Sequence, residues 1–133
     1  MKLTRASNYA LQALAYLVDQ PADRSVASHV AAEARGIPER FLLKVLQPLV
    51  SAGVLRSIKG PNGGYRLAKP PKQITLLQVI EAVDGPIRGE APAVGKDGAA
   101  TLDKRLQTVC DALATLVRER LARVTLAEMA RAK

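Results

Sequence analysis

The amino-acid sequence predicts a mainly α-helical fold with one small β-hairpin, an α+β class. Apolar residues recur at three- and four-residue intervals in several separate segments, which is the period of helices with one buried face. One run, residues 59–64, consists mostly of turn-forming Gly, Pro and Asn and lies between two short β-prone segments. The chain has 133 residues, of which 48% are hydrophobic and only 3% aromatic, so we expect one core of aliphatic side chains.

The first predicted helix spans residues 4–18, and Pro21 ends it. Its apolar stripe consists of Ala6, Tyr9, Ala10, Ala13, Leu14, Leu17 and Val18. Ser25 is placed to cap a second, short helix, and Gly36 suits the left-handed conformation that closes a helix. The residues expected on the inner face of this second helix are Val26, Val30, Ala31 and Ala34.

A third helix is predicted to begin near Pro38, because proline is favoured in the first turn of a helix. Glu39 lies favourably at its positive end, and Gly53 ends it. The predicted buried face is formed by Phe41, Leu42, Val45, Leu46 and Leu49. Two helices joined by a short glycine-containing turn, the second of them amphipathic, are typical of a helix-turn-helix.

The segment that follows predicts the hairpin. Residues 54–58 and 65–67 are β-prone, and the turn between them carries Lys59 at its tip. A basic hairpin directly after a helix-turn-helix indicates the wing of a winged helix, here about residues 54–68. We do not expect the glycines to form a phosphate-binding loop, because no Gly-Lys-Ser/Thr run and no helix follow them.

Beyond the wing, Thr75 is placed to cap a fourth helix that ends at Gly85. Residues 86–100 carry little hydrophobic pattern and are predicted to be a flexible loop. The predicted division of the chain is therefore a winged helix-turn-helix domain (1–85), a loop (86–100), and a long helix with a short C-terminal helix (101–133).

From Leu102 the apolar residues alternate four- and three-residue steps for roughly five turns or more, which predicts a long amphipathic helix. Thr125 and Glu128 have the spacing of a capping box and predict a brief final helix around Met129. The long helix either packs on its own domain or pairs with the same helix of a second subunit, and we favour the homodimer. The residues expected at that dimer interface are Leu102, Leu106, Val109, Leu113, Leu116, Val117 and Leu121.

The charge is distributed unevenly along the chain. Lys and Arg number 20 against 12 Asp and Glu, a formal net charge of +8. Residues 1–72 hold 11 basic and 4 acidic side chains, whereas residues 73–133 hold 9 and 8. Between Glu39 and Glu81 there is no carboxylate. A domain that only kept itself soluble would mix the two signs, so this pattern predicts a face for a polyanion, with nucleic acid ahead of an anionic membrane.

The cysteine and histidine counts exclude several kinds of site. A single cysteine, Cys110, excludes an internal disulfide and a multi-thiolate metal site within one chain, and a single His29 excludes a multi-histidine site. We therefore expect neither a metal nor a cofactor. For Cys110 we expect a buried structural thiol, and a redox-sensitive thiol and a ligand shared between subunits are the alternatives.

Other classes of protein are also disfavoured. No nucleophile–base pair is visible, so we do not expect an enzyme. No stretch approaches the roughly 18 to 20 apolar residues of a membrane span. Lys2 and Arg5 precede an uncharged run in the manner of a signal peptide, but Ser7, Asn8 and Gln12 interrupt that run. We expect a cytoplasmic protein without a membrane partner.

At several places the residues resemble those of one family, the bacterial winged-helix transcription regulators that include IscR, CymR and NsrR. The resemblance is close over residues 1–85. It rests on Met1-Lys2-Leu3-Thr4 with Tyr9-Ala10, Gly36-Ile37-Pro38 with Phe41-Leu42, Ala52-Gly53-Val54-Leu55, and Lys59-Gly60-Pro61-Asn62-Gly63-Gly64-Tyr65-Arg66-Leu67-Ala68. It implies a cytoplasmic homodimer that binds promoter DNA, usually to repress, with the long helix crossing to the partner.

The sequence also departs from that family. Cluster-binding members place three cysteines in the loop before the long helix, whereas residues 85–105 of this chain contain none. The resemblance therefore implies a member without an iron-sulfur cluster, responding to an unidentified small-molecule effector, to a partner protein, to a thiol change or to no signal.

The residues expected to contact double-stranded DNA fall into three groups. Outer residues of the third helix are expected in the major groove, where Arg reads guanine, Gln reads adenine and Leu touches a thymine methyl; they are Arg40, Leu43, Lys44 and Gln47. The wing supplies Arg56, Lys59 and Arg66, and its glycines Gly60, Gly63 and Gly64 let the backbone approach DNA closely. Contacts to the DNA backbone are expected from Lys2, Arg5, Ser7, Tyr9, Ser25 and Ser28.

The function predicted is a sequence-specific regulator, a homodimeric repressor that binds a pseudo-palindromic operator. The alternative is a protein-interaction module, such as an antitoxin-like adaptor, with nonspecific DNA affinity. In that case the long helix would bind a different chain.

Overall fold

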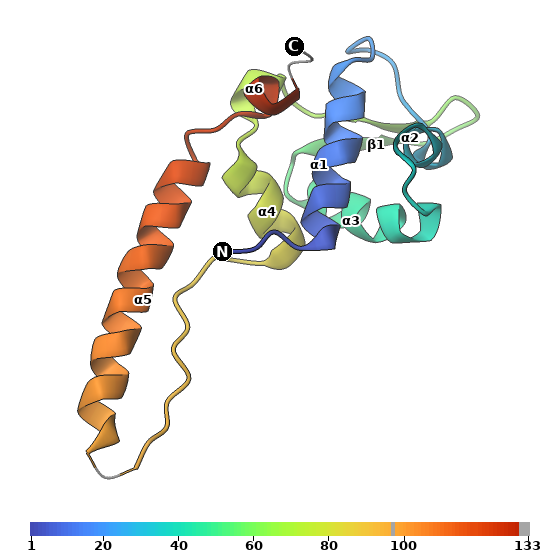
Figure 1. The fold of residues 1–133 in the computed structure, drawn as a ribbon. Helices are drawn as coiled ribbons and strands as arrows, with labels where there is room; N and C mark the ends of the chain where they lie inside the picture. The colour runs from blue at the N-terminus through green and yellow to red at the C-terminus, as the bar shows by residue number, and fades with distance from the viewer. Residues whose placement is uncertain (97, 131–133) are drawn as a thin grey trace.

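The computed structural model describes residues 1–96 and 98–130 (Figure 1). Its elements are α1 (Arg5–Val18), α2 (Ser28–Arg35), α3 (Glu39–Ser51), β1 (Leu55–Ile58), β2 (Gly64–Leu67), the 3-10 helix η1 (Pro71–Gln73), α4 (Leu76–Asp84), α5 (Ala99–Leu121) and α6 (Leu126–Ala130). The predicted mainly α fold with one hairpin is confirmed. The elements from α1 to α4 form a domain, α5 extends well beyond it, and α6 returns to it (Figure 1).

The start of α1 is tied to the end of α4. Thr4 caps α1, because its hydroxyl accepts a hydrogen bond from the Ser7 amide at 3.0 Å. The same hydroxyl donates to the Asp84 carboxylate at 2.9 Å, and the fully buried Ser7 hydroxyl donates to it at 2.8 Å. A carboxylate at the positive end of a helix is favourably placed. Ser7 is therefore buried inside the domain, and its predicted contact with DNA is wrong.

The second helix begins two residues later than its capping pattern predicts. Ala27, not Ser25, occupies the N-cap position. Val26 lies before the helix and exchanges two backbone hydrogen bonds with Tyr65 of β2, at 2.9 and 2.8 Å. This strand-like pairing occupies the backbone that a cap at Ser25 needs, so the helix starts only beyond it. Gly36 ends α2 with φ +65°, as predicted.

The inner face of α2 also differs from the prediction. Val30 is 40% exposed and Ala34 is exposed, while Ala31 and Ala32 are buried. The helix packs on the core through Ala31 and Ala32, so Val30 and Ala34 lie toward solvent. In α3, Leu42, Val45, Leu46 and Leu49 are buried as predicted. Phe41 is instead 38% exposed, because it lies at the edge of that buried stripe and borders a pocket beside α1.

The wing is a two-stranded antiparallel hairpin. Its register pairs Leu55 with Leu67 and Arg56 with Arg66. A turn closes it through the Gly63 amide, which donates to the Gly60 carbonyl at 2.9 Å. The bridge between Val26 and Tyr65 anchors β2 to the segment before α2. The hairpin is thus held against the helix-turn-helix.

The segment between α4 and α5 is not a free loop. Thr75 and Gln78 form a capping box at the start of α4, and Gly85 ends that helix. Residues 86–96, which we call the strap, then run beside the N-terminal half of α5 (Figure 1). Side chains of α5 bond the strap backbone, for example Gln107 to Gly89 at 2.7 Å. This arrangement could not be predicted from the sequence, because hydrogen bonds between side chains and the backbone produce no periodic pattern of apolar residues.

The C-terminal segment returns to the core of the domain. Leu126 is 1% exposed and belongs to the same cluster as Leu14, Leu42 and Ile74. The Leu126 amide donates to the Ile74 carbonyl at 2.7 Å, and Thr125 forms an isolated bridge with Thr75. The predicted division of the chain at residue 85 therefore does not divide the core, since α6 completes the packing of residues 1–85.

We predict that Leu126→Ala lowers the free energy of unfolding by about 3 kcal/mol, because truncating a buried leucine removes apolar contacts and leaves a cavity. The measurement is urea unfolding at a fixed protein concentration. The matched control is Met129→Ala in the same helix, where the side chain is 56% exposed and the expected cost is within about 1 kcal/mol. Equal costs at both positions would contradict the assignment of α6 to the core.

Candidate nucleic-acid interface

One face of α3 is fully available to a ligand. Arg40, Lys44 and Gln47 are exposed, and Leu43 is 43% exposed. These residues lie opposite the buried stripe of the helix, as the three- and four-residue spacing predicts. The outer face of α3 therefore presents two cations, an amide and an apolar side chain along one line.

Phe41 organises the cations of this face. The Arg40 guanidinium lies 4.8 Å from the centroid of the Phe41 ring, and the Lys44 ammonium lies 5.8 Å from it. Cations are attracted to an aromatic face at these distances. The sequence reasoning missed this role, because Phe41 fits the apolar period of the helix and was placed in the core.

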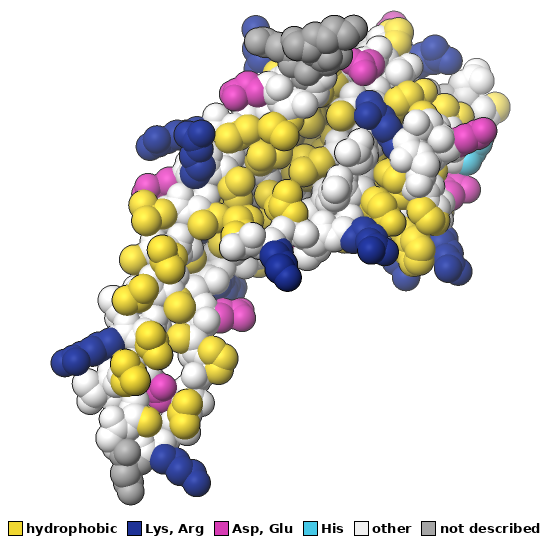
Figure 2. Space-filling model, viewed as in Figure 1, with side chains coloured by type: hydrophobic (Ala, Val, Ile, Leu, Met, Phe, Trp, Pro, Cys, Tyr) yellow, Lys and Arg dark blue, Asp and Glu magenta, His cyan; other side chains and the backbone are white. Residues whose placement is uncertain are grey.

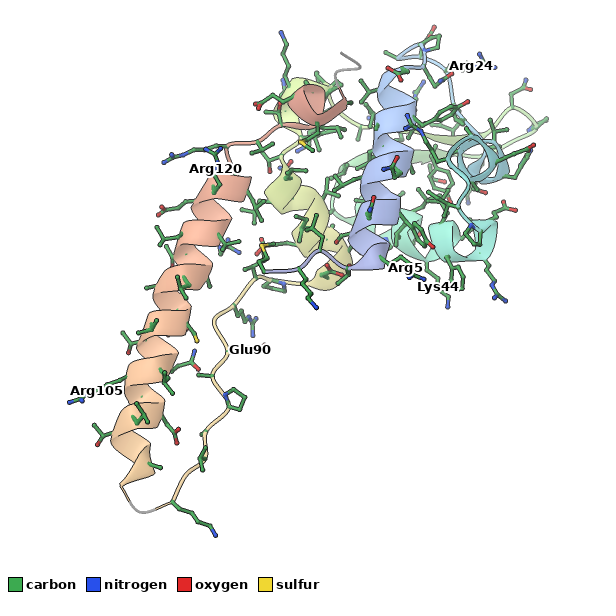
Figure 3. The ribbon with its side chains drawn as sticks, viewed as in Figure 1. Arg5, Arg24, Lys44, Glu90, Arg105 and Arg120 are labelled. Atoms are coloured by element: carbon green, nitrogen blue, oxygen red, sulfur yellow. The ribbon has the colours of Figure 1, made fainter. Side chains whose placement is uncertain are left out.

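Residues from α1 and α3 meet around one shallow pocket. Its volume is about 290 Å³, and Arg5, Tyr9, Phe41 and Lys44 line it together with Ala6 and Val45. Arg5 and Lys44 lie close together at the same end of the domain (Figure 3). The α1 residues expected at the DNA backbone and the α3 residues expected in the major groove thus line the same pocket. Lys2 is exposed just before α1.

The wing carries cations on both strands. Arg56 lies directly opposite Arg66 in the hairpin register, and like charges in that position repel each other. Arg66 is half-buried and donates a hydrogen bond to the Asp23 carbonyl at 3.2 Å. Arg56 and the tip residue Lys59 are exposed. The register thus places two cations opposite each other on the wing.

Two of the predicted glycine contacts have a different basis. A Cβ on Gly64 would overlap the backbone of Val26, and Gly64 has φ +147°. A Cβ on Gly63 would overlap the Ile58 carbonyl. These glycines make room for the protein's own backbone. Only Gly60, with φ +108°, has open space beside its Cα and suits the predicted close approach to DNA.

The serines expected near DNA are placed differently from one another. The Ser28 hydroxyl, at the start of α2, donates to the Glu39 carboxylate at 2.7 Å. This bond joins the first turns of α2 and α3 and fixes the turn between them. Ser25 is half-buried beside the wing. The carboxylate of Glu39 is thus engaged at the edge of an otherwise basic face.

The long helix α5 presents two different faces. Leu102, Leu106, Val109, Leu113 and Leu116 form an outer stripe in which each side chain is 46% to 60% exposed. Asp103, Gln107 and Cys110 lie about a third of a turn away and are half-buried. Asp103 and Gln107 bond the strap, and the backbone of Cys110 lies next to Gly89. Val117 and Leu121 are also half-buried and do not share the outer stripe. Figure 2 shows hydrophobic side chains along α5 and on the adjoining face of the domain.

The helix-turn-helix, its basic outer face and the anchored wing define a winged-helix DNA-binding domain. A model of the Rrf2 family, described as an iron-dependent transcriptional regulator, matches residues 3–132. The chain therefore belongs to the Rrf2 family of transcriptional regulators, which confirms the resemblance found in the sequence. The family and its relatives are regulators and not enzymes, in agreement with the sequence prediction.

The chain is also similar to individual proteins, one of them named as a transcriptional regulator. The chain is 31% identical over 137 residues to the candidate HTH-type transcriptional regulator MT1325 of Mycobacterium tuberculosis, covering 98% of this chain and 81% of that protein. It is 39% identical over 84 residues to protein aau3 of Rhizobium meliloti, which covers 63% of this chain and 54% of that protein. The chain thus spans about half the length of aau3.

Solved structures share the fold along the whole chain. CymR, the global cysteine regulator of B. subtilis, superposes with a TM-score of 0.76 at 24% identity, covering 100% of this chain and 98% of that one. IscR of T. potens superposes with a TM-score of 0.71 at 26% identity, covering 97% and 85%. None of the helices within residues 1–96 and 98–130 is long and apolar enough to cross a membrane.

The donors of this chain do not fit the iron dependence in the family's description. The sequence has one cysteine and one histidine. Among the residues that the structure describes, no three His, Cys, Asp or Glu side chains gather as a metal site. Cys110 is half-buried on α5, less buried than expected, and His29 is exposed on α2. Iron and iron-sulfur centres require several such ligands, so one subunit lacks the ligand set.

We predict that Gly64→Ala lowers the free energy of unfolding by roughly 2 kcal/mol, because the added methyl overlaps the Val26 backbone and the positive φ strains an alanine. Thermal or urea unfolding measures this change. Asn62→Ala, at an exposed position of the same turn, is the control and should stay within about 0.5 kcal/mol of wild type. A neutral Gly64→Ala would show that β2 is not packed against Val26.

Proposed function

We propose that the chain is a cytoplasmic, homodimeric transcription repressor that binds a pseudo-palindromic operator through α3 and the wing, without an iron-sulfur cluster. The single observation that carries the proposal is the outer face of α3. Arg40, Leu43, Lys44 and Gln47 are exposed together on it, within a stretch, residues 40–80, that contains no carboxylate. This set offers bidentate and apolar contacts to base edges in a major groove.

The remaining cations suit contacts with the DNA backbone. Arg5 and Lys44 meet at one pocket between α1 and α3, and cations there neutralise phosphates and set the register of the protein. Lys59 at the exposed tip of the wing suits the adjacent minor groove. Arg56 and Arg66 are paired across the hairpin, and their charges suit contacts with DNA phosphates. Ser28 contributes by holding the turn through Glu39, not by a free hydroxyl.

The outer stripe of α5 supports the homodimer. Five apolar side chains at alternating four- and three-residue steps are mostly exposed, and such a seam is buried when two copies of a helix pair. A twofold dimer presents two α3 helices about one turn of DNA apart, roughly 34 Å. Val117 and Leu121 are left out of the proposed seam, because they are half-buried and lie off the outer stripe.

Selection from a random pool of double-stranded DNA at near-physiological salt tests the proposal. An enriched inverted repeat is expected from the wild-type protein, with affinity that falls steeply as salt rises. Binding without enrichment would instead support an interaction module with nonspecific DNA affinity.

We predict that Arg40→Ala weakens binding to the selected site by roughly 1 to 3 kcal/mol and relaxes the preference at one base position, because it removes a bidentate base contact. Fluorescence anisotropy with the wild-type site and single-base variants measures both effects. Lys72→Ala is the matched control, since Lys72 is an exposed cation on η1 at the other end of α1. Similar losses in the two variants would remove Arg40 from the readout.

We predict that Leu113→Glu converts the dimer into a monomer and reduces affinity for the inverted repeat to that for a single half-site. The reason is that two carboxylates would be buried at the seam. Sedimentation velocity gives the mass. Thr108→Glu, on the exposed third face of α5, should remain dimeric. A monomeric wild type, or a stable complex with a different chain, would contradict the homodimer.

A further inference from the structure

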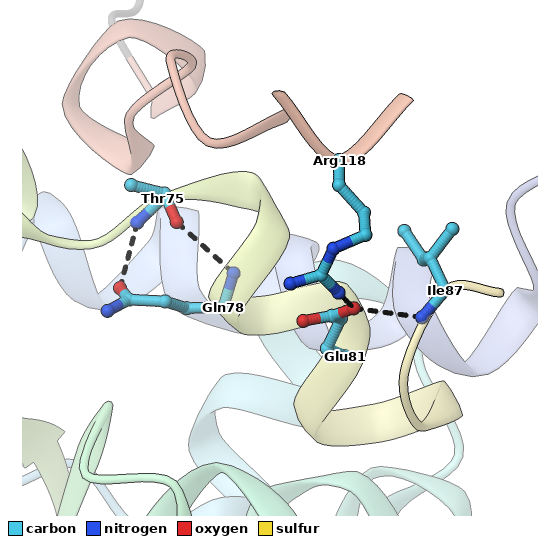
Figure 4. A network of polar contacts seen from close by, with 5 residues as sticks. All are labelled: Thr75, Gln78, Glu81, Ile87 and Arg118. Carbon is cyan, nitrogen blue, oxygen red and sulfur yellow. Dashed lines mark hydrogen bonds and ion pairs between the residues drawn. The ribbon is translucent and has the colours of Figure 1, made fainter. Parts of the chain in front are cut away.

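The strap is fastened to α5 at three places along its length. At its start, the Ile87 amide donates to the Glu81 carboxylate at 2.8 Å, and Arg118 of α5 pairs with that same carboxylate (Figure 4). At its far end, the Val94 and Gly95 amides both donate to the Asp103 carboxylate at 3.0 Å. The third and central fastening is made by Gln107.

Gln107 uses both ends of its side-chain amide on the strap. Its Nε2 donates to the Gly89 carbonyl at 2.7 Å, and its Oε1 accepts from the Ala91 amide at 3.1 Å. The same Nε2 donates to the Asp111 carboxylate at 2.7 Å. Gln107 is half-buried. An amide is the side chain that supplies a donor and an acceptor at once, so this set of bonds specifies glutamine.

The close approach at Gly89 is independent evidence that the strap is built to fit α5. A Cβ on Gly89 would overlap the backbone of Cys110 and Asp111. Because its φ lies outside the left-handed region, the reason for glycine here is space and not conformation. The strap backbone thus lies directly on the backbone of α5, next to the Gln107 bonds.

The strap supports the part of α5 that nothing else in the described chain holds. The C-terminal end of α5 is fixed by α6 and by the bond from the Leu76 amide to the Val124 carbonyl at 2.9 Å. Its N-terminal half projects away from the domain with only the strap beside it (Figure 1). The strap follows Gly85, the C-cap of α4, and the residue before that cap is Asp84, which is bonded to α1. A path of fixed contacts therefore runs from the DNA-binding domain to the far end of α5.

We propose that Gln107 is a positioning residue, the centre of a metal-free latch that fixes α5 relative to the winged helix and so sets the half-site spacing that a dimer accepts. The inference rests on the proposed homodimer. The latch consists of Glu81, Asp103, Gln107 and Arg118 with the strap backbone. Its fastenings are amide, carboxylate and guanidinium side chains, and among the described residues no three His, Cys, Asp or Glu side chains gather as a metal site.

The first test measures the latch itself in the full-length protein by amide hydrogen exchange. In Gln107→Ala the protection of the Ala91 amide should fall by about fivefold or more, because its acceptor is gone. The Leu126 amide, in the core, should not change. Thr108→Ala, a neighbour that bonds only within its helix, should match wild type. Unprotected strap amides in the wild type would overturn the latch, whatever the protein binds.

The second test measures spacing, using the selected inverted repeat with its centre lengthened or shortened by single base pairs. Wild-type affinity should fall about tenfold or more per step, because each step shifts and rotates one half-site. In Gln107→Ala and in Gly89→Ala the penalty should shrink to within about threefold, while affinity for one half-site stays unchanged. An unaltered spacing profile in both variants would overturn the positioning role. A wild type that binds no repeat would instead count against the proposed function.

A charge-based rescue separates positioning from a general loss of stability. Gln107→Glu places a carboxylate beside the Asp111 carboxylate, which should open the latch and broaden the spacing profile. Adding Asp111→Asn replaces the repelling carboxylate with an amide that can donate to the introduced carboxylate. The Gly89 carbonyl still lacks its donor, so the double variant should recover part of the wild-type spacing penalty, more than Gln107→Glu alone. A double variant with the same spacing profile as Gln107→Glu alone would contradict the role of the Gln107–Asp111 bond in the latch. The wild-type profile should also be the same with ferrous iron and with EDTA, and a change with either would assign the positioning to a metal.

Discussion

The burial of Leu126 is the contact on which the arrangement of the molecule depends. With this side chain 1% exposed among Leu14, Leu42 and Ile74, the last short helix is part of the first domain's core. The long helix before it is therefore held at its C-terminal end by the packing of the whole domain. If α6 were free, α5 would be attached to the domain only through the strap and the Arg118–Glu81 ion pair, and its position relative to α3 would be less well fixed.

The DNA-binding face shows a second physical constraint, the accumulation of like charge on a small domain. Phe41 stays partly exposed and lies under both Arg40 and Lys44, while Arg56 and Arg66 face each other across the hairpin. These arrangements lower stability or gain little for it in the absence of a ligand. A concentration of cations on one face is consistent with membership of a family of transcriptional regulators.

Much of the fold was predictable because it depends on local periodicity. The helices α1, α3, α4 and α5 follow from apolar spacing, and Gly36 was correctly expected as a left-handed cap. The errors occurred where a distant backbone competes with a local preference. Val26 pairs with Tyr65, so α2 begins later than predicted. The Ser7 hydroxyl donates a hydrogen bond to the Asp84 carboxylate, 77 residues away. Phe41 has the period of a core residue but lies at the edge of the area that neighbouring helices cover.

The sequence alone determined the helix-turn-helix, the wing, the separation of charge and the family, because these follow from local patterns and from a short, specific motif. The tertiary structure decided which of those residues act together. Only folding joins Arg5 to Lys44, returns α6 to the core, and lays the strap on α5 through Gln107 and Gly89. These contacts connect residues far apart in the chain through polar and backbone groups, which obey no period, so no sequence pattern records them.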